Sequence, residues 1–133
     1  MKFSFLLFII LLSSISISAQ HKNADKAVQR FIKLFNDKEF GLIYNSLSPV
    51  YQQEISKEDL NYYLKDIYGM AGKFKSATYK SLIKNTYNYF LIAVSNDVNA
   101  DFEFVIDENN KLGSLNFKQI GGSGNPPEML KIN

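Results

Sequence analysis

The spacing of apolar residues changes near the middle of this chain of 133 residues. Before Gly72, apolar residues recur at intervals of three and four, which is typical of amphipathic helices. After Gly72 they alternate with polar residues, which is typical of strands with one buried face. Helices followed by strands predict an α+β fold, in which about three amino-terminal helices pack on one face of a curved four-stranded antiparallel sheet.

The helical half has recognisable start and stop signals. The first helix begins near Asn23, and a short second helix around residues 42–47 ends before Pro49, because the residue preceding a proline avoids helical geometry. Pro49 then opens another helical turn. Ser56 and Asp59 have the spacing of a capping box, which predicts a third helix that ends at the following glycines.

The strand half contains four alternating segments, at residues 73–83, 87–97 and the two halves of 99–118. The last two are joined by "DENNKLG", whose Asn and Gly residues favour a hairpin turn. In the second segment, Phe90, Ile92 and Val94 are expected to share the buried face. Lysines in the first segment discourage edge-to-edge pairing, which predicts an outer strand.

The densest acidic run of the chain lies in the third predicted strand, where Asp101, Glu103 and Asp107 share one face. The opposite face carries Phe102, Phe104 and Ile106. If the acids pointed inward, these three apolar side chains would be exposed, at a cost of roughly 1.5–3 kcal/mol each. We therefore expect the acids on a solvated face or at a dimer interface, and not in an active site.

The first twenty residues have the layout of a secretory signal peptide. Lys2 precedes an apolar run at 5–12 and a serine-rich end, which predicts cleavage near Ala19 or Gln20. The run is much shorter than the roughly 20 residues that span a bilayer, so a membrane anchor is the weaker alternative. We expect a periplasmic or secreted protein with no membrane attachment after cleavage.

Composition argues against several classes of site. The chain has no cysteine and a formal net charge of +2, so disulfides, thiolate metal sites and nucleic-acid binding are not expected. Its single histidine, His21, lies beside the predicted cleavage point and lacks partners for a catalytic dyad or a metal site. No G-x-S-x-G occurs, and "GGSG" belongs to a Gly- and Pro-rich tail at 121–133. We predict no catalytic residue, no metal and no cofactor.

The helical segment "VQRFIKLFNDKEFGLIYNSLSPVYQQEISKEDL" followed by four strands resembles the nuclear transport factor 2-like (cystatin-like) superfamily. More narrowly, the chain resembles a secreted bacterial domain of unknown function, similar to the amino-terminal accessory domain of some exported serine hydrolases. The resemblance covers residues 23–120 and implies a cone-shaped single domain whose bent sheet and helices enclose a cavity. Side chains expected to line this cavity are Phe31, Phe35, Tyr63, Phe90, Phe104 and Phe117.

Three functions are compatible with these features. The first is an exported non-catalytic module that binds another exported protein, a second copy of itself or a small apolar ligand, through the sheet face or the cavity. The second is a minimal isomerase or dehydratase that uses a tyrosine hydroxyl. The third is an accessory domain detached from an exported serine hydrolase, with the tail as a linker remnant. For Tyr63 two roles stay open: a hydroxyl in the cavity, or core packing with the hydroxyl bonded to a backbone carbonyl or to water.

Overall fold

The computed structural model describes residues 2–95 and 98–121, with the side chains of 2–18 and 119 left out. It confirms the α+β prediction, with four helices followed by four strands. The elements are α1 Lys2–Asn36, α2 Phe40–Asn45, α3 Pro49–Glu54, α4 Lys57–Ala71, β1 Phe74–Ile83, β2 Thr86–Ala93, β3 Asn99–Ile106 and β4 Leu112–Ile120. The prediction of about three helices was one short, because the turn that Pro49 opens forms a separate helix.

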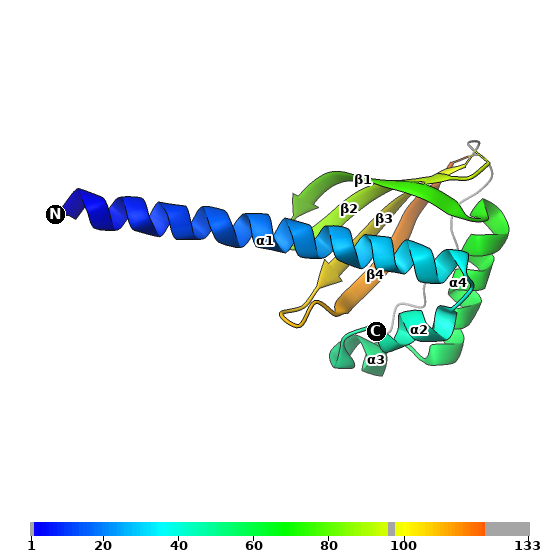
Figure 1. Ribbon diagram of the computed structural model, residues 1–133. Helices are drawn as coiled ribbons and strands as arrows, with labels where there is room; N and C mark the ends of the chain where they lie inside the picture. The colour runs from blue at the N-terminus through cyan, green and yellow to red at the C-terminus, as the bar shows by residue number, and fades with distance from the viewer. Residues whose placement is uncertain (1, 96–97, 122–133) are drawn as a thin grey trace.

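The strands form one open antiparallel sheet in the order β1-β2-β3-β4, so β1 and β4 are its edges. Helix α1 crosses one face of the sheet, and its amino-terminal part extends past the sheet, away from α2, α3 and α4 (Figure 1). The predicted cleavage point lies within this continuous helix. Among the described residues, no helix combines the length and the hydropathy needed to cross a membrane. The predicted flexible tail, apart from Gly121, lies outside the described residues.

The predicted starts at Pro49 and Ser56 are confirmed, whereas the start predicted near Asn23 is wrong, because α1 runs without a break from Lys2 to Asn36. The Ser48 side chain accepts a hydrogen bond from the Tyr51 backbone N–H at 3.2 Å, with Pro49 in the first position of α3. The Ser56 side chain accepts from the Asp59 N–H at 3.0 Å and caps α4. Helix α4 ends at Gly72, whose φ of 68° favours glycine.

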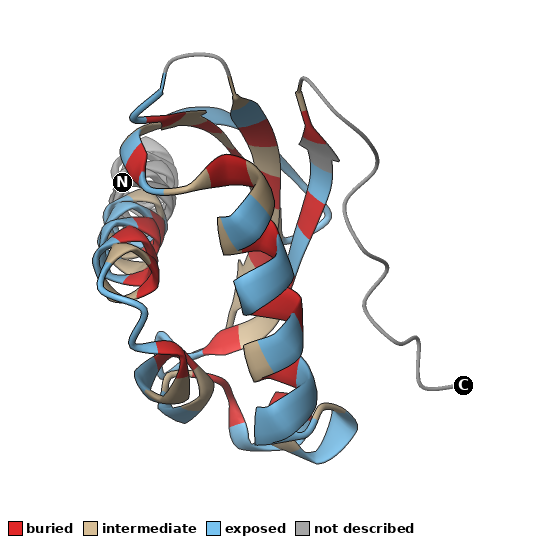
Figure 2. Cartoon of the chain, turned by 90° about the vertical axis from the view of Figure 1, so that its right-hand side faces the viewer, coloured by how far each residue is buried: buried red, intermediate tan, exposed pale blue. Residues whose placement is uncertain are grey.

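The core lies between the helices and one face of the sheet, and Figure 2 shows buried residues gathered there on α1, α4 and the strands. Its centre is aromatic: the Phe31 ring of α1 stacks on Phe102 of β3 with ring centroids 4.5 Å apart. Phe117 of β4 lies 4.9 Å from Phe102 by the same measure. Aromatic pairs at such distances stabilise a core beyond their area burial alone.

The predicted orientation of β2 was wrong. Residues of β2 alternate between half-buried and buried, and the buried set is Tyr87, Tyr89, Leu91 and Ala93. Phe90 and Ile92 therefore lie on the opposite face, and Val94 is exposed beyond the strand. Pairing with β3 explains the difference. Tyr89 pairs with the buried Phe102, whereas Phe90 pairs with Asp101 on the open face.

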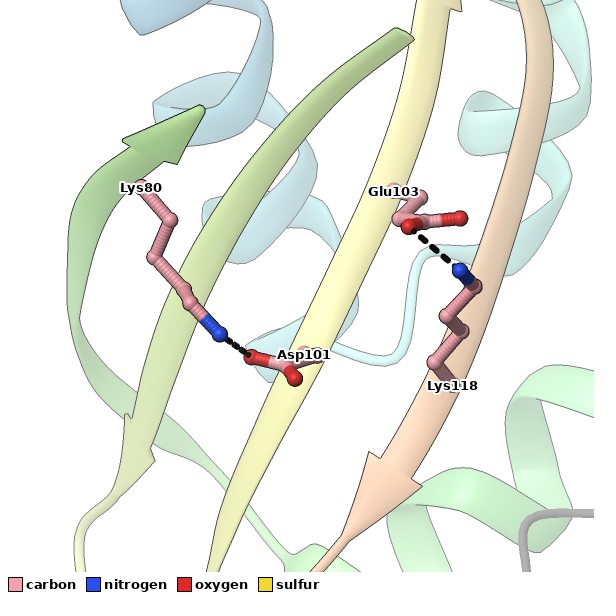
Figure 3. Close-up of polar contacts among 4 residues, drawn as sticks. All are labelled: Lys80, Asp101, Glu103 and Lys118. Atoms are coloured by element: carbon pink, nitrogen blue, oxygen red, sulfur yellow. Dashed lines mark hydrogen bonds and ion pairs between the residues drawn. The ribbon is translucent and has the colours of Figure 1, made fainter. Parts of the chain in front are cut away.

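The orientation predicted for β3 is confirmed for Asp101 and Glu103, which lie on the face turned away from the helices (Figure 3). Lys80 of β1 contacts the Asp101 carboxylate at 2.8 Å. Lys118 of β4 contacts the Glu103 carboxylate at 3.0 Å. The acids are therefore paired with lysines across the open face of the sheet.

Asp107 does not belong to this row, because β3 ends at Ile106. One oxygen of the Asp107 carboxylate accepts hydrogen bonds from the Asn109 N–H at 2.8 Å and the Lys111 N–H at 2.9 Å. The β3–β4 ladder is also irregular between Val105 and Ile106, which leaves Ile106 half-buried. The acidic side chain thus fixes the turn between β3 and β4.

Candidate functional site

The residues predicted to line a cavity are separated by the sheet. Phe90 lies on the open face of β2. The other five are at most 5% exposed and belong to the core: Phe31, Phe35, Tyr63, Phe104 and Phe117. They pack closely, since the ring centroids of Phe31 and Phe35 are 5.8 Å apart and those of Tyr63 and Phe117 are 6.4 Å apart. Of these, Phe31 lines the smaller of the two pockets described below.

The Tyr63 hydroxyl is bonded to the backbone. It accepts a hydrogen bond from the Phe117 N–H of edge strand β4 at 3.0 Å. Burial raises the pKa of Tyr63 to about 12, although the backbone contact to Phe117 lowers it. Tyr51 makes a second hydrogen bond to the backbone of β4, because its hydroxyl donates to the Leu115 carbonyl at 3.4 Å. Tyr63 therefore packs in the core, but the partner of its hydroxyl is a backbone N–H and not the expected carbonyl or water.

The larger pocket has a volume of about 410 Å³ and lies where α1 passes over the two hairpin ends of the sheet. Helix α1 contributes the polar side chains of Gln20 and Asn23. The β1–β2 hairpin contributes Leu82, Asn85 and Tyr87. The β3–β4 hairpin contributes Val105, Ile106, Asp107, Glu108 and Asn110.

We call this the acidic pocket, because its described lining includes two carboxylates and no lysine or arginine. Four amide side chains and the Tyr87 phenol add hydrogen-bonding groups, and the aliphatic side chains add an apolar wall. Its volume lies within the range of roughly 300–1,000 Å³ that is usual for small-molecule sites. This lining is suited to a small molecule that donates hydrogen bonds or carries a positive charge.

A cluster of His21, Asp25 and three tyrosines flanks the acidic pocket between α1 and the β1–β2 hairpin. The His21 ring meets the Tyr79 ring edge-on with centroids 4.0 Å apart and lies 6.2 Å from the Tyr87 ring. The Tyr89 hydroxyl donates to the Asp25 carboxylate. Burial and this hydrogen bond raise the pKa of Tyr89, and burial with the charges of nearby groups raises that of Tyr87. Both phenols therefore stay protonated, as hydrogen-bond donors, at neutral pH.

From the sequence, His21 was placed beside the predicted cleavage point and given no role, and Asp25 was not singled out. The structure places both residues within α1, four positions apart, so they lie on the same side of the helix. Tyr87 and Tyr89 alternate on the inward face of β2. The spacing of four residues between His21 and Asp25 could have indicated that they share one side of a helix. The tyrosines of β2 that they contact could not be found, because the wrong face of β2 was assigned to the core.

The smaller pocket has a volume of about 190 Å³ and continues along the same stripe of α1. Its lining residues are Ala27, Arg30, Phe31, Ser46, Asn109, Asn110, Lys111 and Leu112. We call it the basic pocket, because it has two cationic side chains and its described lining includes no carboxylate. Asn110 lines both pockets, so they adjoin at the β3–β4 turn. We refer to the two together as the α1 groove.

The described residues show no metal centre. Within residues 2–95 and 98–121, no three His, Asp or Glu side chains are placed to share an ion.

Comparison with known proteins gives one match, to a protein family. No curated protein and no solved structure matches the chain significantly. Residues 28–115, which run from α1 into β4 and make up about two thirds of the chain, match the family described as "Protein of unknown function (DUF3887)". The chain belongs to this family.

Proposed function

We propose that this chain is an exported, non-catalytic binding domain, and that its ligand is a small hydrogen-bonding or cationic molecule held in the acidic pocket. The observation that carries the proposal is the pocket's lining. Asp107 and Glu108 lie beside four amides, and none of the described lining residues is a lysine or an arginine. Kinship with the nuclear transport factor 2-like superfamily is part of the proposal, and the order of four helices and four antiparallel strands supports it.

The proposed ligand differs from the apolar one that the sequence suggested. Five of the six aromatic residues expected around an apolar cavity pack in the core, and the sixth, Phe90, lies on the open face of the sheet. The acidic pocket instead offers amides and carboxylates, with Leu82, Val105 and Ile106 as its aliphatic wall. Such a site recognises polar groups by hydrogen bonds and holds the ligand's carbon skeleton by contact.

The polar groups of the chain favour binding over catalysis. The Asp25–Tyr89 pair lines neither the acidic nor the basic pocket. The raised pKa of Tyr87, which does line the acidic pocket, suits a neutral donor and not a base. Ser81 and Lys84 have the S-x-x-K spacing of some serine hydrolases, but they stand on a strand and in a hairpin turn, where that spacing does not bring the amine to the hydroxyl.

One observation favours a second candidate, the minimal isomerase-type enzyme. The Asp25 carboxylate contacts the Tyr89 hydroxyl, which is the acid–phenol combination that such chemistry uses. In this candidate the pair would polarise a substrate oxygen beside the acidic pocket. Replacing Asp25 by Asn would then abolish turnover of a substrate while leaving its binding intact.

Native mass spectrometry of protein recovered gently from the producing culture tests the binding proposal. The wild-type protein is expected to carry a reproducible small-molecule mass. Glu108→Gln is expected to lose that mass, because it removes a carboxylate from the pocket wall. Asp66→Asn, which removes an exposed carboxylate of α4 outside both pockets, is the matched control and is expected to retain it. A bare wild-type protein, or a bound mass that survives Glu108→Gln, would refute a ligand in the acidic pocket.

A further inference from the structure

We infer that the basic pocket is an anion subsite, and that the α1 groove recognises short zwitterionic peptides, with the terminal ammonium group in the acidic pocket and the terminal carboxylate in the basic pocket. The ammonium half of this inference rests on the proposed function. The carboxylate half rests on the basic pocket alone.

The two cations of the basic pocket come from opposite walls. Arg30 projects from α1, and Lys111 stands at the end of the β3–β4 turn, directly before β4. In the described part of the chain, neither forms an ion pair with a carboxylate. The two acids of the turn, Asp107 and Glu108, line the acidic pocket instead, and one Asp107 carboxylate oxygen accepts two backbone N–H groups. Both cations are therefore available to an anion that enters the pocket.

The remaining lining of the basic pocket suits one compact charged group. Its volume of about 190 Å³ is smaller than that of a usual small-molecule site. Phe31 is 2% exposed and belongs to the core, so it forms a fixed apolar floor. The Ser46 hydroxyl donates to the Ile43 carbonyl at 2.6 Å and is held in place. A carboxylate fits this arrangement, because an arginine guanidinium can donate two parallel hydrogen bonds to it.

The separation of the pockets sets the length of the ligand. Gln20, Asn23, Ala27 and Arg30 form one stripe of α1, and the stripe begins in the acidic pocket and ends in the basic pocket. With a rise of about 1.5 Å per residue, the stripe is about 15 Å long. An extended peptide covers about 3.3–3.6 Å per residue, so about four residues span the stripe. The opposite charges at its ends fix the direction of the peptide.

Isothermal titration calorimetry with tetraalanine tests the inference. Four forms are compared: the free peptide, its N-acetyl form, its carboxy-amidated form and the doubly blocked form. Amidation is expected to weaken binding to the wild type at least about fivefold, because it removes the charge that faces Arg30 and Lys111. This loss is expected to shrink in Arg30→Gln and in Lys111→Gln, because each variant keeps only one of the two cations. The matched control Lys33→Gln, at an exposed lysine of α1 outside both pockets, is expected to keep the loss.

The two ends of the peptide separate this inference from the proposed function. N-acetylation is expected to weaken binding to the wild type and to Arg30→Gln, but not to Glu108→Gln. If amidation has no effect, or if its effect is undiminished in both basic-pocket variants, the anion subsite is refuted while the ammonium site stands. If no form of the peptide binds at millimolar concentration, the peptide inference is refuted, and native mass spectrometry alone decides the proposed function. Both substituted cations are exposed, and circular dichroism verifies that each variant is folded.

Discussion

Replacing Tyr63 by Phe removes one oxygen from the interface between α4 and the sheet edge. The Phe117 N–H, which donates to that oxygen at 3.0 Å, is then left without its acceptor next to buried side chains. An unsatisfied buried amide costs about 1–3 kcal/mol, so we expect the variant to be about 2 kcal/mol less stable than the wild type at pH 7. The substitution keeps the ring and therefore leaves no large cavity.

The pH dependence of this loss distinguishes the hydroxyl from a general packing effect. The pKa of Tyr63 rises from 10.0 to about 12 in the folded protein, mainly because of burial. Below pH 10 the phenol is protonated in both the folded and the unfolded chain, and its full contribution to stability is present. Between pH 10 and 12 it ionises first in the unfolded chain, so that contribution falls as the pH rises, by about 3 kcal/mol in total. The Phe variant lacks this loss.

We therefore expect the stability difference between wild type and Tyr63→Phe to shrink above pH 10 and to vanish or reverse near pH 12. Urea unfolding followed by far-ultraviolet circular dichroism at pH 7, 9, 10, 11 and 12 measures it, since the chain has no tryptophan to report. Tyr62→Phe is the matched control, because the neighbouring Tyr62 is 61% exposed and is expected to show no difference at any pH. A Tyr63→Phe difference that stays constant from pH 9 to pH 12 would refute the reasoning.

Three further predictions concern single side chains outside α4. Asn36→Ala is expected to lower the free energy of unfolding by about 1–3 kcal/mol, because the Asn36 amide bonds both the Phe74 N–H at 2.9 Å and the Phe74 carbonyl at 2.7 Å; unchanged urea unfolding would contradict this. Asp25→Asn is expected to lower the pKa of Tyr89, which donates to it, and that of Tyr87, because the Asp25 charge raises both; an unshifted tyrosine absorbance titration at 295 nm would contradict that role. Lys84→Asn is expected to raise the melting temperature slightly, because Lys84 has a φ of 49° in a two-residue hairpin turn that favours Asn; a lower melting temperature would show that the lysine stabilises the turn in another way.

The overall fold was predictable because its signals are local. Pro49, Ser56 and Gly72 mark helix boundaries through the backbone geometry and caps that these residue types favour. In β3 the two faces differ sharply in polarity, so alternation was enough to decide which face packs on the helices. Where adjacent residues differ in polarity as strongly as Phe102 and Glu103, burial of the apolar side chain determines which face of the strand packs on the helices.

The orientation of β2 was not predictable from alternation, because both faces of the strand carry large side chains. The neighbouring strand β3 determines whether Phe90 or Tyr89 is buried. Tyr89 pairs with the buried Phe102 and therefore lies on the same face of the sheet. A phenol also tolerates burial when its hydroxyl finds a partner, and Asp25 supplies one for Tyr89. The polar residue that makes this burial possible stands on α1, 64 positions earlier in the chain.

The α1 groove was hidden from the sequence for a related reason. Its walls come from four separate segments of the chain, and no segment alone carries a motif of a binding site. The polar residues Gln20 and Asn23 interrupt the apolar stripe of α1, and in sequence such a position predicts only the end of a buried face. Once α1 lies across the hairpin ends, the same interruption becomes the wall of a pocket, because polar side chains there leave the apolar ends of the strands without a packing partner. In this fold, the polar residues at the end of the amphipathic face of α1 therefore coincide with the acidic pocket.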